Sequence, residues 1–304
     1  MPKLAPINYE EIHDGLIDLG LKESTARTYM GKMRKVLKGV FGKDAVTKAV
    51  LKKNTKKIVE YISSDDYKNA NTRKVALMAI THLFTLYDLP VEYFEKFVVD
   101  WSRLADAEAV TNTSAEVIEN IKNIDFGEIE KSIATTDDPT DRLIKAFYCG
   151  WIPPLRQQDL INVKVVDSPS SAKNSPNRNV LILRSNRLLV REHKTEKTHG
   201  AKSVPLPFKL MKEVRKYLKD MDTMVLFPFS SSGFTRRMIR LFGCSTSTFR
   251  KAYVSKVAPT MSAEERARVA EIMGHKISTA MVSYHKDIKP DTEDKSDDGE
   301  SESD

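Results

Sequence analysis

The chain has 304 residues, of which 40% are hydrophobic and 30% are charged. This length exceeds that of a typical single domain, so two domains that each bury a core are expected. The two cysteines, Cys149 and Cys244, lack CxxC or zinc-ligand spacing and are too few for a disulfide-stapled secreted scaffold, and no stretch reaches the roughly 20 apolar residues of a membrane span.

The formal net charge of +7 combines two opposite regions. Residues 290–304 contain eight acidic residues and one lysine, which gives −7, so residues 1–289 carry +14. A body this basic attracts polyanions such as nucleic acid, although solubility is the simpler reading of excess charge. The acidic segment has too little apolar surface to fold alone, which predicts a disordered tail over 290–304. The first residues lack a signal-peptide pattern, so an intracellular protein without a membrane partner is expected.

The first hundred residues repeat apolar side chains with the 3.6-residue period of a helix. A small all-helical domain over residues 1–107 is therefore expected. The predicted helices cover residues 9–19, 24–42, 56–62, 71–87 and 91–104.

Basic side chains occupy the polar faces of these segments and recur further along the chain. For any single helix, a solvated face is the simpler interpretation. If the domain binds DNA, these side chains are its candidate phosphate contacts. The candidates are Arg27, Arg34, Lys35, Lys38, Lys52, Lys53, Arg236 and Arg237.

The apolar period lapses at residues 105–114, which predicts an interdomain linker and a second domain over residues 108–289. Helices are expected at 115–123, 126–133 and 141–149, and again from residue 208 onward. Short segments rich in Val and Leu at 180–184, 187–193 and 203–206 predict strands, with Ser185-Asn186 as a two-residue turn. The expected fold class is mainly α with a small antiparallel β-sheet.

The segment SAEERARVAEIMGHKISTAMVSY carries a specific pattern. Ser262 and Glu265 predict a capping box that opens a helix, and Gly274 predicts its left-handed end. His275 then lies on the turn, and Tyr284 follows nine residues later on a second predicted helix. Taken singly, a histidine and a tyrosine at these places are more often structural than catalytic.

Met273-Gly274-His275 followed by Tyr284 resembles the signature of the tyrosine recombinase (phage integrase) family, in which the tyrosine is the nucleophile. Upstream, the run PLRQQDL resembles the family's first arginine motif. The run HKT before SVPLP resembles its lysine hairpin, and STFR occupies the place of its His-x-x-Arg motif. The matched residues are Arg156, Lys194, Ser247, Arg250, His275 and Tyr284.

The sequence departs from the family pattern at two positions. Ser247 stands where histidine is usual and cannot hold a proton near neutral pH, and Pro154 stands where glycine is usual. Lys194 is the better match to the family's catalytic lysine, and Lys197 is the second candidate for that role. The departures resemble those of eukaryotic viruses and mobile elements more than those of bacterial chromosome-dimer resolvases.

The resemblance implies a core-binding domain over 1–107, a catalytic domain over 108–289, and strand transfer through a 3′-phosphotyrosyl intermediate on double-stranded DNA. It implies a homotetramer on DNA, no cofactor and no metal, and a place with DNA in the nucleus, a viral factory or a prokaryotic cytoplasm. His193 and His199 have no carboxylate or thiol companion that would make a zinc site. Residues 200–203, GAKS, are only a fragment of a phosphate loop.

The residue types suit a metal-free attack on a phosphodiester. Two arginines can hold the non-bridging oxygens, a lysine can protonate the leaving oxygen, and nearby cations favour the phenolate. Two alternatives remain at this stage: a type IB topoisomerase, which shares the constellation, and a non-catalytic DNA-binding factor derived from the family.

Overall fold

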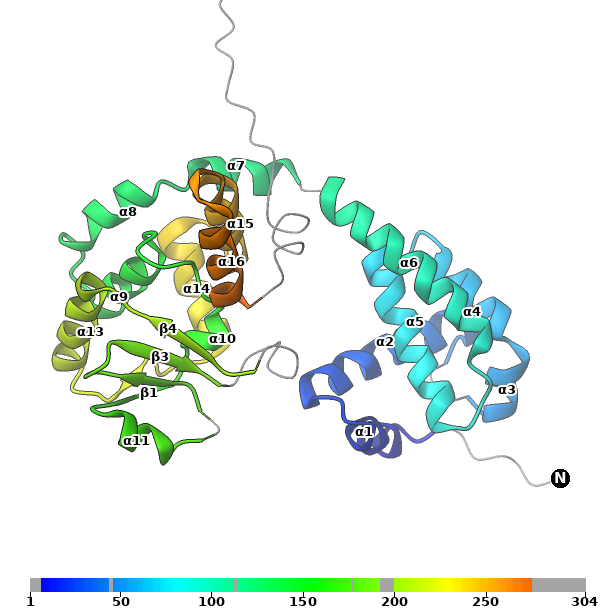
Figure 1. The fold of residues 1–304 in the computed structure, drawn as a ribbon. Helices are drawn as coiled ribbons and strands as arrows, with labels where there is room; N and C mark the ends of the chain where they lie inside the picture. Colours follow the sequence, from blue (N-terminus) through cyan, green and yellow to red (C-terminus); the bar gives the residue numbers. More distant parts are fainter. Residues whose placement is uncertain (1–6, 44–45, 112–113, 177, 192–199, 275–304) are drawn as a thin grey trace, which may run out of the picture. The chain divides into compact units, whose positions relative to one another are not determined.

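The computed structural model describes residues 7–43, 46–111, 114–176, 178–191 and 200–274. It is mainly helical with one small five-stranded sheet, which confirms the predicted fold class, although the sheet is mixed rather than wholly antiparallel (Figure 1). The chain divides into two compact units, residues 1–112 and 113–304. None of the helices in the described ranges is both long and apolar enough to pass through a bilayer.

Unit 1 is all-helical within the ranges described. Helices α2 and α5 bury their apolar faces in one core. The buried face of α2 is the face that the sequence predicts, with Tyr29, Met33 and Leu37 inside. The helices are α1 (Tyr9–Asp18), α2 (Glu23–Phe41), α3 (Lys48–Lys53), α4 (Thr55–Ser63), α5 (Ala70–Leu86) and α6 (Glu92–Thr111).

The boundary between the two units, between residues 112 and 113, lies within the predicted linker at residues 105–114, but α6 continues to Thr111, so most of that segment is helical. Two physical reasons account for the difference. The run ADAEA loses the apolar stripe but consists largely of strong helix formers. In addition, the Glu108 carboxylate accepts a hydrogen bond of 2.9 Å from the backbone N–H of Ala70, which fastens the far end of α6 to the start of α5.

Unit 2 surrounds a sheet of order β4-β3-β2-β1-β5 with helices. Three of its four pairings are antiparallel, while β1 and β2 are parallel because α11 forms a crossover between them. Its strands are β1 (Val163–Val166), β2 (Val180–Ile182), β3 (Arg187–Val190), β4 (Lys202–Pro205) and β5 (Val225–Leu226). Its helices among the described residues are α7 (Ala115–Asn123), α8 (Phe126–Ile133), α9 (Pro139–Tyr148), α10 (Gln157–Leu160), α11 (Pro169–Lys173), α13 (Phe208–Asp220), α14 (Ser231–Phe242), α15 (Thr246–Lys256), the 3-10 turn η1 (Ala258–Thr260) and α16 (Ala263–Met273).

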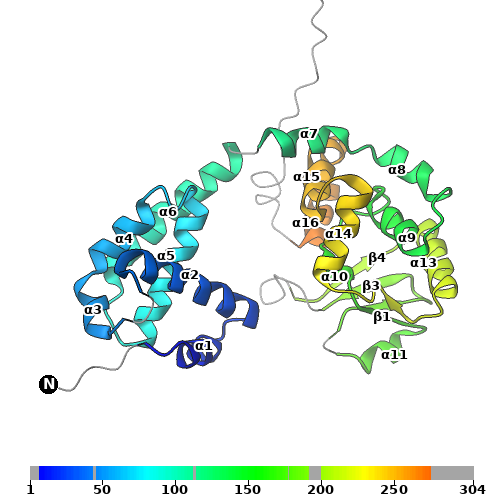
Figure 2. The same cartoon turned by 180° about the vertical axis from the view of Figure 1, so that it is seen from behind.

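Alternate residues of the strands face two different layers. Val165, Leu181 and Leu188 belong to the main core of the unit, whereas Val180 and Ile182 belong to a small cluster with Ala172 of α11. Both views show α11 beside β1 at the edge of the unit (Figure 1, Figure 2). The period of two along each strand therefore gives the sheet one face toward the main helical core and one toward α11.

Helix α16 begins and ends as the sequence predicts. The Ser262 hydroxyl accepts from the backbone N–H of Glu265 at 3.2 Å, and the Glu265 carboxylate accepts from the N–H of Ser262 at 2.8 Å, so the capping box is confirmed. Gly274 ends the helix in the left-handed conformation, with φ of 69°. This end of α16 reaches the candidate site.

Candidate functional site

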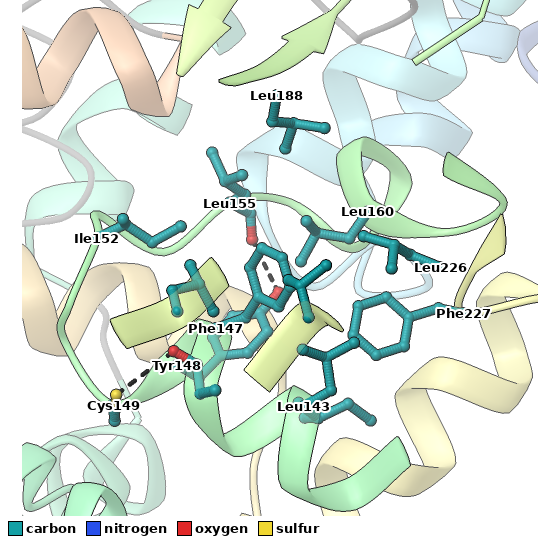
Figure 3. Close-up of a cluster of buried hydrophobic side chains, with 14 of the residues drawn as sticks. Leu143, Phe147, Tyr148, Cys149, Ile152, Leu155, Leu160, Leu188, Leu226 and Phe227 are labelled. Carbon is teal, nitrogen blue, oxygen red and sulfur yellow. Dashed lines mark hydrogen bonds between the residues drawn. The ribbon is translucent and has the colours of Figure 1, made fainter. Parts of the chain in front are cut away.

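The backbone that carries Arg156 is fixed by a hydrogen bond and by packing against the core of unit 2. The buried Tyr148 hydroxyl, at the end of α9, donates a hydrogen bond of 2.9 Å to the carbonyl of Leu155, and Figure 3 shows this phenol among Phe147, Leu160 and neighbouring apolar side chains. Arg156 follows directly as the residue that precedes α10. The core thereby fixes the backbone from which the Arg156 side chain projects.

Arg250 is a buried side chain that connects neighbouring segments of the same site. It lies on α15 with 2% of its surface exposed, and its two terminal nitrogens donate to two backbone carbonyls at 2.8 Å each. One carbonyl belongs to Pro154, before α10, and the other belongs to Met273, at the end of α16. A single guanidinium thus joins three segments that are far apart in the sequence, through charge-assisted bonds.

Gly274 lies beside the side chains of both Arg156 and Lys202. Its carbonyl accepts a hydrogen bond from Nη2 of Arg156 at 3.3 Å. A Cβ at this position would clash with Nζ of Lys202 and approach Nη1 of Arg156 to 3.3 Å. The left-handed backbone and the close cations together require glycine at position 274.

Lys202 completes the cluster from the first residue of β4. Its side chain is only 5% exposed, and its Nζ lies 3.9 Å from Oδ2 of Asp159, whose side chain is 1% exposed. Burial lowers the pKa of Lys202, as do Arg156 and Arg250, while Asp159 raises it. The sequence pattern gave no indication of Lys202, since residues 200–203 resemble only a phosphate-loop fragment.

The cluster has more positive than negative charge in the described part of the chain. Lys202 lies near one carboxylate, Asp159, and is close enough to the cations Arg156 and Arg250 for both to lower its pKa. Nη1 of Arg156, Nζ of Lys202 and both carboxylate oxygens of Asp159 are buried without a hydrogen-bond partner among the described residues. Buried polar groups in this condition require a ligand or a functional explanation, and the excess of cations favours an anion.

The structure brings together Arg156 and Arg250 of the predicted catalytic set and places Ser247 nearby. Ser247 is exposed on α15, one helical turn before Arg250. His275, which follows Gly274 directly, lies outside the described residues, as do Tyr284, Lys194, the reserve Lys197 and the acidic tail.

Tyr253 lies on α15, three residues after Arg250, and is an alternative nucleophile to consider. Its side chain is buried, its ring meets that of Phe126 edge to face at 6.0 Å, and burial raises its pKa. A buried phenol with a raised pKa is a poor nucleophile.

The predicted DNA contacts of unit 1 are exposed, but several have neighbours within the chain. Arg27 pairs with Glu23 at 2.6 Å, and Arg34 and Lys35 lie over the rings of Tyr9 and Tyr67 at 4.4 and 4.7 Å. A cation over an aromatic ring keeps most of its donors available. The exposed members of the set in this unit are Arg27, Arg34, Lys35, Lys38, Lys52 and Lys53.

Arg236 and Arg237, adjacent on α14, have different surroundings. Arg236 is exposed, whereas Arg237 donates to the buried carboxylate of Asp141 at 2.7 Å, and Arg240 donates to the same carboxylate at 2.6 Å. Arg237 therefore has a structural partner that the sequence did not indicate.

We expect Asp141→Asn to lower the free energy of unfolding by about 1 to 3 kcal/mol, because Arg237 and Arg240 would lose a charged acceptor while remaining partly solvated. Chemical denaturation of the variant beside Asp137→Asn, an exposed acid just before α9, measures this. Equal stability of the two variants would show that the arginines are only surface charges.

No protein-family model matches the chain, and no curated protein matches it. Among solved structures, the chain is similar to one described as the crystal structure of XerA recombinase, with 13% identity over 91% of this chain and 92% of that one and a TM-score of 0.38. A likeness this distant assigns no activity. In the described ranges, no three His, Cys, Asp or Glu side chains come together as a set that would hold a metal ion.

Proposed function

We propose that this chain breaks and rejoins DNA as a tyrosine recombinase, with Tyr284 as the nucleophile. The observation that supports the proposal most strongly is the convergence of Arg156, Arg250 and Gly274, which belong to three separate motifs, in one buried cluster with excess positive charge. Motifs that are 118 residues apart can bind one phosphate only if the fold brings them together.

In the proposed reaction, the phenolic oxygen of Tyr284 forms a bond to phosphorus and the bond to the 5′ oxygen breaks. His275 takes the phenolic proton, and Lys194 gives a proton to the departing 5′ oxygen. Arg156 stabilises the negative charge on the non-bridging oxygens, and Arg250 holds the segments that carry Arg156 and Gly274 together. The reverse reaction reseals a strand without ATP because the phosphodiester energy is kept in the phosphotyrosine.

The double-stranded DNA partner and the homotetrameric assembly are parts of the same proposal. Unit 1 would act as a core-binding domain through its exposed basic side chains, and unit 2 would carry the chemistry. The proposed location is wherever that DNA lies: the nucleus, a viral factory or a prokaryotic cytoplasm.

The test is to trap a covalent intermediate. Nicked suicide duplexes with a randomised core lose the short cleaved strand, so an adduct that survives denaturation accumulates and its DNA can be sequenced. Adducts enriched in one sequence, together with strand exchange between two such sites, support the proposal. Plasmid relaxation without any exchange would indicate a type IB topoisomerase instead. Tight DNA binding without adducts on the whole library would indicate a non-catalytic DNA-binding factor.

We expect the basic face of α2 to bind DNA phosphates. Replacing Arg34, Lys35 and Lys38 by Gln should reduce the slope of log affinity against log salt by about 0.9 for each phosphate that the protein no longer neutralises. The matched control replaces the exposed Lys212, Lys216 and Lys219 of α13 by Gln, which removes the same charge from another surface. Fluorescence anisotropy on a mixed-sequence duplex measures both slopes, and equal reductions would refute a specific role for α2.

A further inference from the structure

Lys202 is a buried ammonium without a hydrogen bond to the protein among the described residues. Its side chain is 5% exposed, and the 3.9 Å that separates it from Asp159 is too long for a hydrogen bond. Burying a lysine in this way is costly unless something accepts its protons. A purely structural salt bridge would close this gap and use the carboxylate oxygens, both of which also lack partners among the described residues.

The ammonium is directed at the same point as Arg156. Nζ of Lys202 and Nη1 of Arg156 both lie close to the position that a Cβ of Gly274 would occupy, and neither atom has a hydrogen-bond partner in the described ranges. Two like charges repel, so their approach from α10 and β4 needs a compensating charge. Asp159 supplies one negative charge against Arg156, Lys202 and Arg250.

We propose that Lys202 is a further contact to the DNA phosphate, donating to a non-bridging oxygen beside Arg156, with Asp159 as the counter-ion that holds the ammonium in place before DNA binds. This inference rests on the proposed function, because it assigns a residue to that phosphate site. It adds a third cation to the described cluster, one that lies in the predicted lysine hairpin but was not among its matched residues. In the described part of the chain, the charged groups that face Lys202 are Asp159 and Arg156 of the α10 segment and Arg250 of α15.

The test uses sulfate as a tetrahedral anion whose charge is constant above about pH 4. The dissociation constant of the sulfate complex is obtained from the rise in Tm of the full chain as millimolar sulfate is added. Sodium chloride keeps the ionic strength the same in every sample. Lys202→Met should weaken sulfate binding by about ten- to a hundredfold, the effect of one charge-assisted hydrogen bond. Asp159→Asn removes the competitor for the ammonium and should tighten binding.

The double variant Asp159→Asn/Lys202→Met separates the specific hydrogen bond from the net charge. It removes one negative and one positive charge, so the net charge of the cluster stays the same. Neither partner is left as a buried charge without the other, so this variant is expected to fold well. We expect it to bind sulfate as weakly as Lys202→Met does. Lys216→Met, an exposed lysine on α13, is the control and should bind sulfate as the unaltered chain does.

The pH profile supplies a second readout. Because the pKa of Lys202 is lowered from 10.5, its ammonium loses its proton at a lower pH than an exposed lysine does. Sulfate affinity should therefore fall as pH rises through that lowered pKa, and the fall should be absent in the double variant. A purely structural role would change the Tm without sulfate but not this profile.

Three results would overturn the inference. The double variant binding sulfate as tightly as the original chain would show that charge alone matters. Unchanged binding in Lys202→Met, with loss in Arg156→Ala, would exclude Lys202 and leave the proposed function standing. No sulfate effect beyond sodium chloride in the unaltered chain would mean that the cluster is not an anion site, whereas the adduct assay would still report on cleavage separately.

Discussion

Tyr284→Phe is expected to abolish the covalent DNA adduct while DNA affinity and Tm stay unchanged. The substitution removes only the phenolic oxygen, the atom that forms the new bond to phosphorus. Loss of a nucleophile typically reduces turnover by roughly 10⁴-fold or more. Denaturing gels of the suicide-duplex reaction measure the adduct, and anisotropy on the same duplex measures binding.

Tyr253→Phe is the matched control, since it also removes one phenolic oxygen from the same unit. Its side chain is buried against Phe126, and the variant should still form the adduct. Adduct formation by Tyr284→Phe and its loss in Tyr253→Phe would reverse the assignment of the nucleophile. Mapping the DNA-linked peptide by mass spectrometry identifies the attached residue directly.

Local signals in the sequence predicted the elements that depend on local chemistry. The capping box at Ser262 and the left-handed turn at Gly274 are determined by residues within a few positions of one another, and the structure has both. The buried face of α2 follows in the same way from its apolar period. The strands predicted at 180–184, 187–193 and 203–206 correspond to β2, β3 and β4. β5 has only two residues, which are too few to establish a period, whereas β1 is as long as β3 and β4 and was nevertheless not predicted.

The features that were missed depend on interactions between distant residues. The helical continuation of α6 through most of the predicted linker was missed, and the bond from Ala70 that fastens this end of the helix comes from Glu108, 38 positions away. The bond of Arg237 to Asp141, across 96 positions, had no local signal. Lys202 was missed for the same reason: nothing around it in the sequence indicates that β3 and β4 bring it beside Asp159.

The two arginines of the candidate site differ in a way that only the structure reveals. Motif matching gives Arg156 and Arg250 the same role, holding phosphate oxygens. In the fold, Arg250 is 2% exposed and its terminal nitrogens bond to the carbonyls of Pro154 and Met273. Arg156 is half-buried, donates to Gly274 at 3.3 Å, and has Nη1 without a partner among the described residues. Arg156 is therefore equipped to bind an anion, and Arg250 to hold the site together.

We expect Arg156→Ala to reduce cleavage by about a hundred- to a thousandfold, the usual effect of losing one transition-state donor. Its free energy of unfolding should change by only about 1 kcal/mol, the value of one ordinary hydrogen bond. Arg250→Ala should reduce cleavage at least as much and also lower the free energy of unfolding by roughly 3 to 5 kcal/mol, since it leaves a cavity and two carbonyls without their donor.

Arg250→Lys separates the effect of the two hydrogen bonds to Pro154 and Met273 from the effect of the positive charge. Lysine keeps the positive charge, but one ammonium cannot reproduce the fork that spans both carbonyls, so stability should stay close to that of Arg250→Ala. Urea denaturation of the three variants, beside adduct formation on the suicide duplex, measures both effects. If Arg250→Lys restored full stability, the charge rather than the two bonds to Pro154 and Met273 would hold these segments. In that case the two arginines would have the equivalent roles that the motifs suggest.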